Sequence, residues 1–73
     1  MDSAKLVTMA NQIAGFFAAQ RGEPVEAAAK HIADNWDGRM RAGLAAHLSA
    51  GGAGLSPVAR RAAEALAARE ACP

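Results

Sequence analysis

Alanine supplies more than half of the apolar side chains in this chain, which limits the core that it can form. Hydrophobic residues make up 52% of the 73 residues, but 21 of them are alanine and only 17 are larger. Domains of this length usually need a disulfide, a metal ion or a partner in addition to their own core. Because Cys72 is the only cysteine, no internal disulfide is available. We therefore expect a single domain, residues 1–73, that gains part of its stability from a protein partner.

The spacing of apolar residues predicts a helical protein, without the alternation that is typical of β-strands. The expected helices span residues 3–20, 24–36, 38–50 and the segment from residue 57 onward. Residues that favour helix ends stand at these boundaries: Ser3, Asp37 and Ser56 as N-caps, Pro24 and Pro57 at first positions, and Gly51 and Gly52 at a C-terminus. The expected fold class is all-α, a small bundle of three to four short helices.

Each expected helix carries an apolar stripe at intervals of three and four residues. The stripes comprise Leu6, Met9, Ile13, Phe16 and Phe17; Val25, Ala28, Ala29, Ile32 and Trp36; Met40, Leu44, His47 and Leu48; and Val58, Ala62, Ala65 and Leu66. The fourth stripe is mostly alanine and ends at Arg69, so it buries little apolar area. Because burial stabilises by about 25 cal/mol per Å², this helix gains little stability from its core face. We expect this last helix to depend on a partner for much of its order. Gly15, inside the first helix, either admits a close neighbour or is a tolerated surface glycine.

The sequence contains no arrangement of residues that is typical of a catalytic or metal site. His31, His47 and Cys72 are too widely spaced to form a paired ligand set. The serines stand where caps and turns favour them. The Gly-Gly-Ala-Gly run at residues 51–54 lacks the lysine of a phosphate-binding loop. We therefore expect no catalytic, cofactor-binding or metal-binding residue in this chain.

The apolar N-terminal segment is too short for a secretion signal or a membrane span. Asn11 and Gln12 interrupt it, which leaves only residues 13–19 uninterrupted, and Asp2 precedes it. No run approaches the roughly 20 apolar residues that cross a bilayer. A lone cysteine also fits a reducing compartment. These features predict a cytoplasmic protein with no membrane partner.

The basic residues of the second half favour a protein partner. Residues 1–37 hold three basic and five acidic side chains, whereas residues 38–73 hold five arginines and two glutamates. Trp36, Arg39 and Met40 lie within five residues of each other, and these residue types are enriched at the centres of protein interfaces. The alternative is that Trp36 and Met40 only pack between the second and third helices. The charges of Arg39 and Arg41 are expected to face water or a partner.

Nucleic-acid binding is an alternative use of the arginines. Arg39, Arg41, Arg60 and Arg61 have the charge needed to contact phosphates. However, a net charge of +1 gives little long-range attraction, and no basic stripe with interleaved aromatic residues occurs. We therefore favour a protein partner and expect no nucleic acid.

Four blocks of sequence stand out from the alanine-rich remainder. They are Leu6-Val7 with residues 9–13 and Phe16-Phe17; His31-Ile32; Trp36-Asp37 with Arg39-Met40-Arg41; and residues 50–57, Ala-Gly-Gly-Ala-Gly-Leu-Ser-Pro. In order and spacing, these blocks resemble the delta subunit of NAD-dependent, molybdenum-containing formate dehydrogenase over residues 5–62. Gly38 departs from the proline that the family pattern has after the Trp-acid pair, which bears on where the third helix starts.

The resemblance implies a place in a cytoplasmic complex that oxidises formate to carbon dioxide and reduces NAD. In such an enzyme, the catalytic (alpha) subunit carries bis-molybdopterin guanine dinucleotide and iron–sulfur clusters. The beta and gamma subunits carry FMN and further clusters. The delta subunit is a small companion without a cofactor, and it supports assembly, stability or cofactor loading of the alpha subunit.

The sequence thus predicts a non-catalytic accessory subunit that docks on the alpha subunit and reaches the beta and gamma subunits through it. The predicted partner-binding residues are Trp36, Arg39, Met40, Arg41, Gly51, Gly52, Leu55 and Pro57. A transient maturation chaperone of the same enzyme is one alternative. A small helical nucleic-acid-binding regulator is another.

Overall fold

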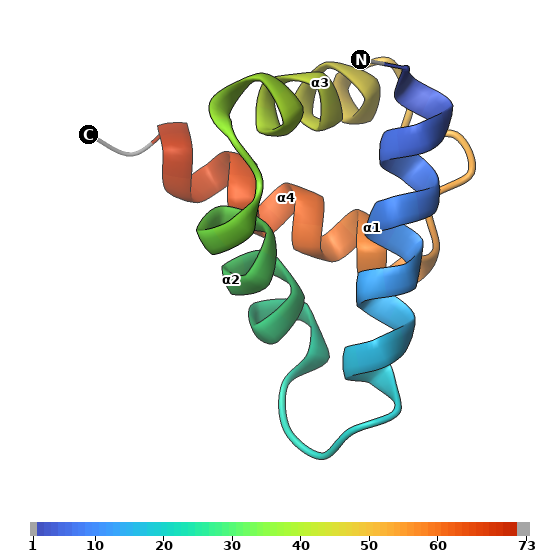
Figure 1. Ribbon diagram of the computed structural model, residues 1–73, viewed down its shortest axis with the longest axis vertical. Helices are drawn as coiled ribbons and strands as arrows, with labels where there is room; N and C mark the ends of the chain where they lie inside the picture. The colour runs from blue at the N-terminus through green and yellow to red at the C-terminus, as the bar shows by residue number, and fades with distance from the viewer. Residues whose placement is uncertain (1, 72–73) are drawn as a thin grey trace.

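The computed structural model describes residues 2–71 and contains four helices (Figure 1). They are α1 (Ser3–Ala18), α2 (Pro24–Asn35), α3 (Gly38–Ser49) and α4 (Pro57–Ala71). No strand occurs in this part of the chain. The predicted all-α class is therefore confirmed, and the predicted helix ends differ from the observed ones by at most two residues, which is within the usual variation of helix assignment.

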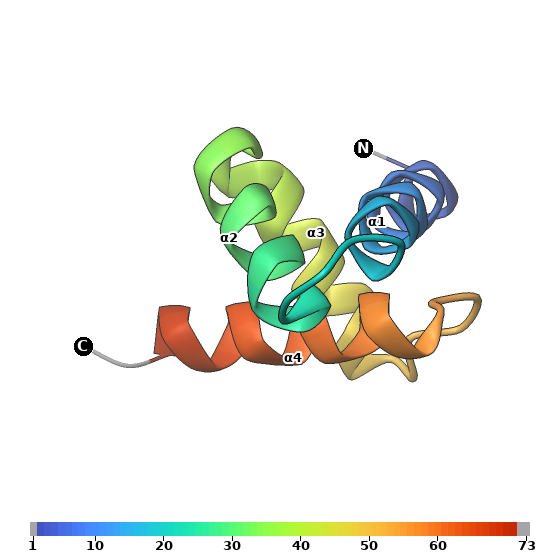
Figure 2. The ribbon, with the colours of Figure 1, turned by 90° about the horizontal axis from the view of Figure 1, so that it is seen from below.

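The helices are arranged with α4 crossing the other three. α1 and α2 are joined at one end by residues 19–23, and α3 lies across the opposite end (Figure 1). α4 contacts α1, α2 and α3, and its contact with α2 is the most extensive. Seen from below, it runs across both α1 and α2 (Figure 2). α4 is a 15-residue helix that packs on α1, α2 and α3, and its dependence on a partner stays a prediction.

Three of the four helix N-termini follow the predicted capping. Asp37 Oδ1 accepts a hydrogen bond from Met40 N at 2.9 Å, so α3 begins at Gly38 without a proline there. Ser56 Oγ accepts from Ala59 N at 3.2 Å at the start of α4. The assignment of Ser3 as the first N-cap is wrong: Asp2 has the extended backbone of a cap and accepts from Ala4 N, while Ser3 is already helical. A carboxylate at this end also suits the helix dipole.

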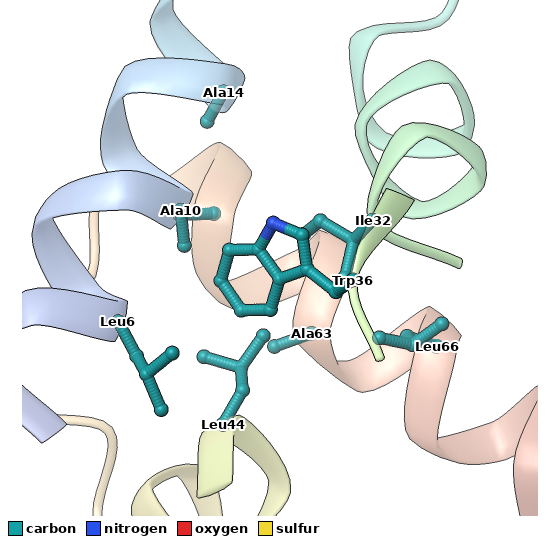
Figure 3. Close-up of a cluster of buried hydrophobic side chains, with 9 residues drawn as sticks. Leu6, Ala10, Ala14, Ile32, Trp36, Leu44, Ala63 and Leu66 are labelled. Atoms are coloured by element: carbon teal, nitrogen blue, oxygen red, sulfur yellow. The ribbon is translucent and has the colours of Figure 1, made fainter. Parts of the chain in front are cut away.

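The core consists mostly of alanine, with Trp36 at its centre. Seven of the twelve buried apolar residues are alanine, and the largest fully buried side chains are Leu6, Ile32 and Leu44. The indole of Trp36 lies among side chains from all four helices (Figure 3). In a second, smaller cluster between α2 and α4 the buried residues are all alanine, namely Ala28, Ala29 and Ala62, and Ile13, Phe17 and Ala65 pack against them.

The predicted stripe of α1 is wrong for Phe16, whose side chain is 60% exposed. Successive residues of a helix are about 100° apart, so Phe16 and Phe17 face different directions. The residues that α1 buries are Leu6, Ala10 and Ala14. In α4, Ala62 and Leu66 are buried as predicted, while Val58 and Ala65 are partly buried against the core. The stripe also includes Ala59 and Ala63, which the prediction left out.

Gly15 and Gly43 show opposite surroundings. A Cβ atom on Gly15 would meet no atom within 4 Å, which agrees with a tolerated surface glycine. A Cβ atom on Gly43 would lie 2.7 Å from Leu6 Cδ1, where α3 approaches α1. Because Leu6 is fully buried, its side chain has little room to move away.

We expect Gly15→Ala to raise the free energy of unfolding by about 1 kcal/mol, through helix propensity alone. Gly43→Ala has the same gain in propensity, but overpacking against Leu6 costs about 1–3 kcal/mol. The expected net effect of Gly43→Ala is therefore a lower free energy of unfolding. Urea unfolding followed by circular dichroism measures both variants. Equal stabilisation by the two substitutions would contradict the close contact between α1 and α3.

Candidate protein interface

Trp36 is a core residue in this fold. It is the C-cap of α2, and only 5% of its surface is exposed. The interpretation of Trp36 as a packing residue between the second and third helices is confirmed, since its ring lies beside Ile32 and Leu44 (Figure 3). Met40 is half-buried against the same cluster. Neither side chain is free to act as a projecting anchor in this conformation.

Arg41 folds back onto the end of α2. Its Nη1 donates to Ala33 O at 3.3 Å and to Trp36 O at 3.0 Å. A cation at this position satisfies carbonyls that the helix leaves unpaired and suits the negative end of the helix dipole. Nε lies 2.7 Å from Glu70 Oε1 in an ion pair, although its N–H does not point along that line and makes no hydrogen bond. The guanidinium of Arg41 therefore faces main chain and Glu70 rather than water.

Arg39 is exposed, and none of the hydrogen bonds or ion pairs among residues 2–71 involves its side chain. The two arginines of the predicted element thus have different roles. Arg41 closes the α2–α3 corner, whereas Arg39 presents its charge to the surface.

The loop between α3 and α4, residues 50–56, is built on glycines with positive φ. Gly51 has φ of 120° and Gly52 has φ of 64°. The N–H groups of these two residues bond to the carbonyls of Leu48 and His47, which is the arrangement of a Schellman C-cap. Gly52 is buried beneath Arg60, whose Nη2 donates to Gly51 O at 3.0 Å and to Gly52 O at 3.1 Å. The glycines therefore end α3 as predicted.

Side chains from α1 and α3 hold the rest of this loop. Asn11 Nδ2 donates to Gly54 O and Asn11 Oδ1 accepts from Ser56 N, both at 2.9 Å. His47 Nε2 lies 2.7 Å from Ala53 O, so the ring donates from this nitrogen. Sequence analysis missed the role of Asn11, because its partners are more than 40 residues away along the chain. Its only sequence signal was a polar residue inside an apolar stripe.

The predicted partner-binding residues do not form one continuous surface. Trp36, Met40, Arg41, Gly52 and Leu55 are buried or half-buried, while Arg39, Gly51 and Pro57 are exposed. Arg39 lies in the first turn of α3 and Gly51 lies beyond its last turn. A helix of this length separates its ends by about 18 Å, at 1.5 Å per residue. The exposed members are therefore at opposite ends of α3.

A groove that sequence analysis did not predict lies beside Phe16. Its volume is about 330 Å³, and its lining consists of Gln12, Ile13, Phe16, Phe17 and His31. The ring of Phe17 makes edge contacts with the rings of Phe16 and His31, at centroid distances of 5.1 and 5.8 Å. The consecutive aromatic pair was the available signal, since two adjacent helical residues cannot both face the core.

A second groove of about 260 Å³ continues from Phe17 along α2 and has a charged rim. Lys30 Nζ donates to Asp34 Oδ2 at 2.7 Å across this rim. This hydrogen bond and the charge of Lys30 lower the pKa of Asp34 below its ordinary value of 3.8. Both side chains are solvent-exposed, so the pair adds little to stability.

The described residues do not gather a ligand set for an iron–sulfur cluster or another metal ion. Iron–sulfur clusters need several cysteine ligands, and the sequence has one, Cys72, which lies outside the described residues. Across residues 2–71, no three His, Cys, Asp or Glu side chains gather as a metal site would require. No helix in this part of the chain is long and apolar enough to cross a membrane.

Comparison with known proteins assigns the chain to a family. Residues 5–63 match the family described as NADH-dependent formate dehydrogenase delta subunit, FdsD. The chain belongs to this family. The matched range includes Asn11, Trp36, Arg41 and the whole α3–α4 loop, so the delta-subunit pattern covers the contacts that close the fold. Comparisons with curated proteins and with solved structures found no match.

We expect Arg41→Ala to lower the free energy of unfolding of this delta subunit by about 2 kcal/mol, because it removes charge-assisted bonds to two carbonyls. Arg39→Ala is the matched control and is expected to stay within about 0.5 kcal/mol of the wild type. Chemical denaturation of the isolated subunit measures both. If the two variants unfold alike, Arg41 does not stabilise the α2–α3 corner.

Asn11→Asp tests the loop anchor. The introduced carboxylate still accepts from Ser56 N, but it places an anion against Gly54 O and loses the donor. We expect a loss of about 1–2 kcal/mol at neutral pH. Because the carbonyl disfavours the charged form, the pKa of the introduced group is raised on folding, and stability returns as the pH falls and the group is protonated.

The measurement for Asn11→Asp is the melting temperature at pH 7 and pH 4, each relative to the wild type at the same pH. Gln12→Glu introduces the same chemical change at the adjacent, exposed position and is expected to show no such recovery. If the melting temperature of the Asn11 variant is lowered equally at both pH values, Asn11 does not act as the proposed donor to Gly54 O.

Proposed function

We propose that this chain is a non-catalytic accessory subunit that docks on the catalytic molybdenum subunit of NAD-dependent formate dehydrogenase in the cytoplasm. The observation that carries the proposal is the family match over residues 5–63. Through the catalytic subunit it associates with the beta and gamma subunits, which supply FMN and further iron–sulfur clusters. The chain supports assembly, stability or cofactor loading and adds no reacting group.

The distribution of polar side chains supports a binding role. Asn11, Arg41, His47 and Arg60 all direct their polar atoms to main-chain groups of the same chain. These polar atoms already form the hydrogen bonds that hold the helix ends and the α3–α4 loop. A general acid or base must instead reach a substrate. Side chains engaged in this way fix the shape of the surface, which suits a part that a partner binds.

For the contact surface, we retain the eight residues predicted from the sequence and divide them by exposure. Arg39, Gly51 and Pro57 are exposed and are proposed to touch the partner. Trp36, Met40, Arg41, Gly52 and Leu55 are proposed to act by fixing the shape of that surface. Arg39 offers a planar cation for a carboxylate of the partner.

Native mass spectrometry of the enzyme, purified through a tag on another subunit, tests the proposal. We expect a stoichiometric component of 7.4 kDa in the mature complex. Absence of this component from active enzyme, together with its presence on the catalytic subunit before cofactor loading, would instead support a transient maturation chaperone.

Arg39→Ala tests the proposed contact without disturbing the fold. We expect about tenfold weaker binding to the catalytic subunit, which corresponds to the loss of a charged interface contact. Arg61→Ala, which removes an exposed arginine from α4, is the matched control and is expected to bind as the wild type does. Equal binding by all three proteins would exclude Arg39 from the interface.

A further inference from the structure

Phe16 is the one large apolar side chain that residues 2–71 leave mainly in solvent. It is 60% exposed, and it forms one wall of the 330 Å³ groove together with Ile13 and Phe17. The groove draws its lining from the C-terminal half of α1 and from His31 of α2. Its volume is at the lower limit of small-ligand sites, which are about 300–1,000 Å³. It suits one or two bulky side chains better than a cofactor.

The surface around Phe16 carries no charge on α1. From Leu6 to Gln20 the sequence has no Asp, Glu, Lys or Arg, although Thr8, Gln12 and Ala19 in this stretch are exposed. Exposed helix faces normally carry charged residues, and charged residues are depleted at the centres of interfaces. The charges of Lys30 and Asp34 lie in the adjoining groove, where these two side chains pair with each other. A charged partner residue inserted against Phe16 would lose its hydration without a carboxylate, lysine or arginine in the lining to pair with it. The complementary surface is therefore uncharged and apolar.

The groove has polar atoms at its edge. The side chains of Gln12 and His31 line it, and none of the hydrogen bonds within residues 2–71 uses either side chain. They are available to bond to main-chain groups of an incoming segment. An apolar centre with a polar rim is the usual composition of a binding hot spot.

We propose that this groove receives an uncharged segment of the formate dehydrogenase catalytic subunit, with one bulky apolar side chain inserted against Phe16 and Phe17. This inference rests on the proposed function and specifies its contact. A second copy of the chain is the less suitable occupant. A stable dimer buries about 800 Å² and 20–30 residues on each partner, which is a large share of a chain whose total accessible surface is 4482 Å². Five lining residues do not reach that extent, whereas a large partner also contacts other faces.

The test measures binding of the delta subunit to the purified catalytic subunit by biolayer interferometry, with wild type, Phe16→Ser, Phe16→Leu and Glu64→Ala. Phe16→Ser removes the apolar wall and is expected to weaken binding at least tenfold. Phe16→Leu keeps an apolar side chain and is expected to stay within about threefold of wild type. Glu64→Ala, on exposed α4 surface, is expected to bind as wild type. Since Phe16 is exposed, thermal unfolding of Phe16→Ser is expected to match wild type.

The outcomes distinguish this inference from the proposed function. If wild type binds and Phe16→Ser binds equally well, the groove is not the contact, while the subunit role stands. If wild type does not bind the catalytic subunit at all, the proposed function fails first. Sedimentation of the isolated chain gives a further outcome: concentration-dependent dimers that Phe16→Ser abolishes, without any change in binding to the catalytic subunit, would assign the groove to a second copy and overturn the inference.

Discussion

The fold depends on the close approach of α4 to the other helices through alanine. Where Ala28 and Ala29 of α2 meet Ala62 of α4, the fully buried side chains are single methyl groups, and Ile13, Phe17 and Ala65 pack around them. Such contacts gain stability from dispersion over a continuous surface. Gly43 also allows a close approach, that of α3 to the Leu6 side chain of α1.

A core of this kind needs one large group where the helices diverge, and Trp36 supplies it. Its position at the C-cap of α2 places the indole between all four helices. The chain then turns at once into α3, and Arg41 fixes that turn by bonding to carbonyls at the end of α2. At the far end of α3, Arg60 and Asn11 hold the loop in the same way. Polar side chains therefore fasten the corners of a bundle whose interior has few bulky groups.

The helices could be predicted from the sequence because their signals are local. Asp37, Ser56 and the two prolines act on neighbouring residues, and so does the pair of glycines that ends α3. Which face of each helix is buried depends on contacts with residues far away in the sequence. The buried face of α4 includes Ala59 and Ala63, which the sequence did not single out, because an alanine-rich helix offers almost no difference between its faces. Only packing decides which alanines are buried.

The candidate site was harder to predict than the fold, because tertiary packing decides which groups its side chains contact. Arg41 and Arg39 are two residues apart and look alike in the sequence, yet one bonds to main chain and the other faces water. The roles of Asn11 and Arg60 depend on a loop that tertiary packing brings to them. Exposure of Phe16 depends on which of two adjacent aromatic residues meets α2. Phe17 makes that contact through His31, which leaves Phe16 outside.

The position of Phe16 links the thin core to the need for a partner. A chain with only 17 apolar side chains larger than alanine gains by placing each of them inside, and a fully buried phenylalanine contributes about 2–3 kcal/mol. Leaving Phe16 in solvent forgoes that contribution in the isolated subunit. The same contribution becomes available when a partner covers the groove, and binding then adds to folding stability by mass action. With the proposed contact, the exposed aromatic residue and the small core have one physical explanation, in which the partner completes part of the hydrophobic stabilisation.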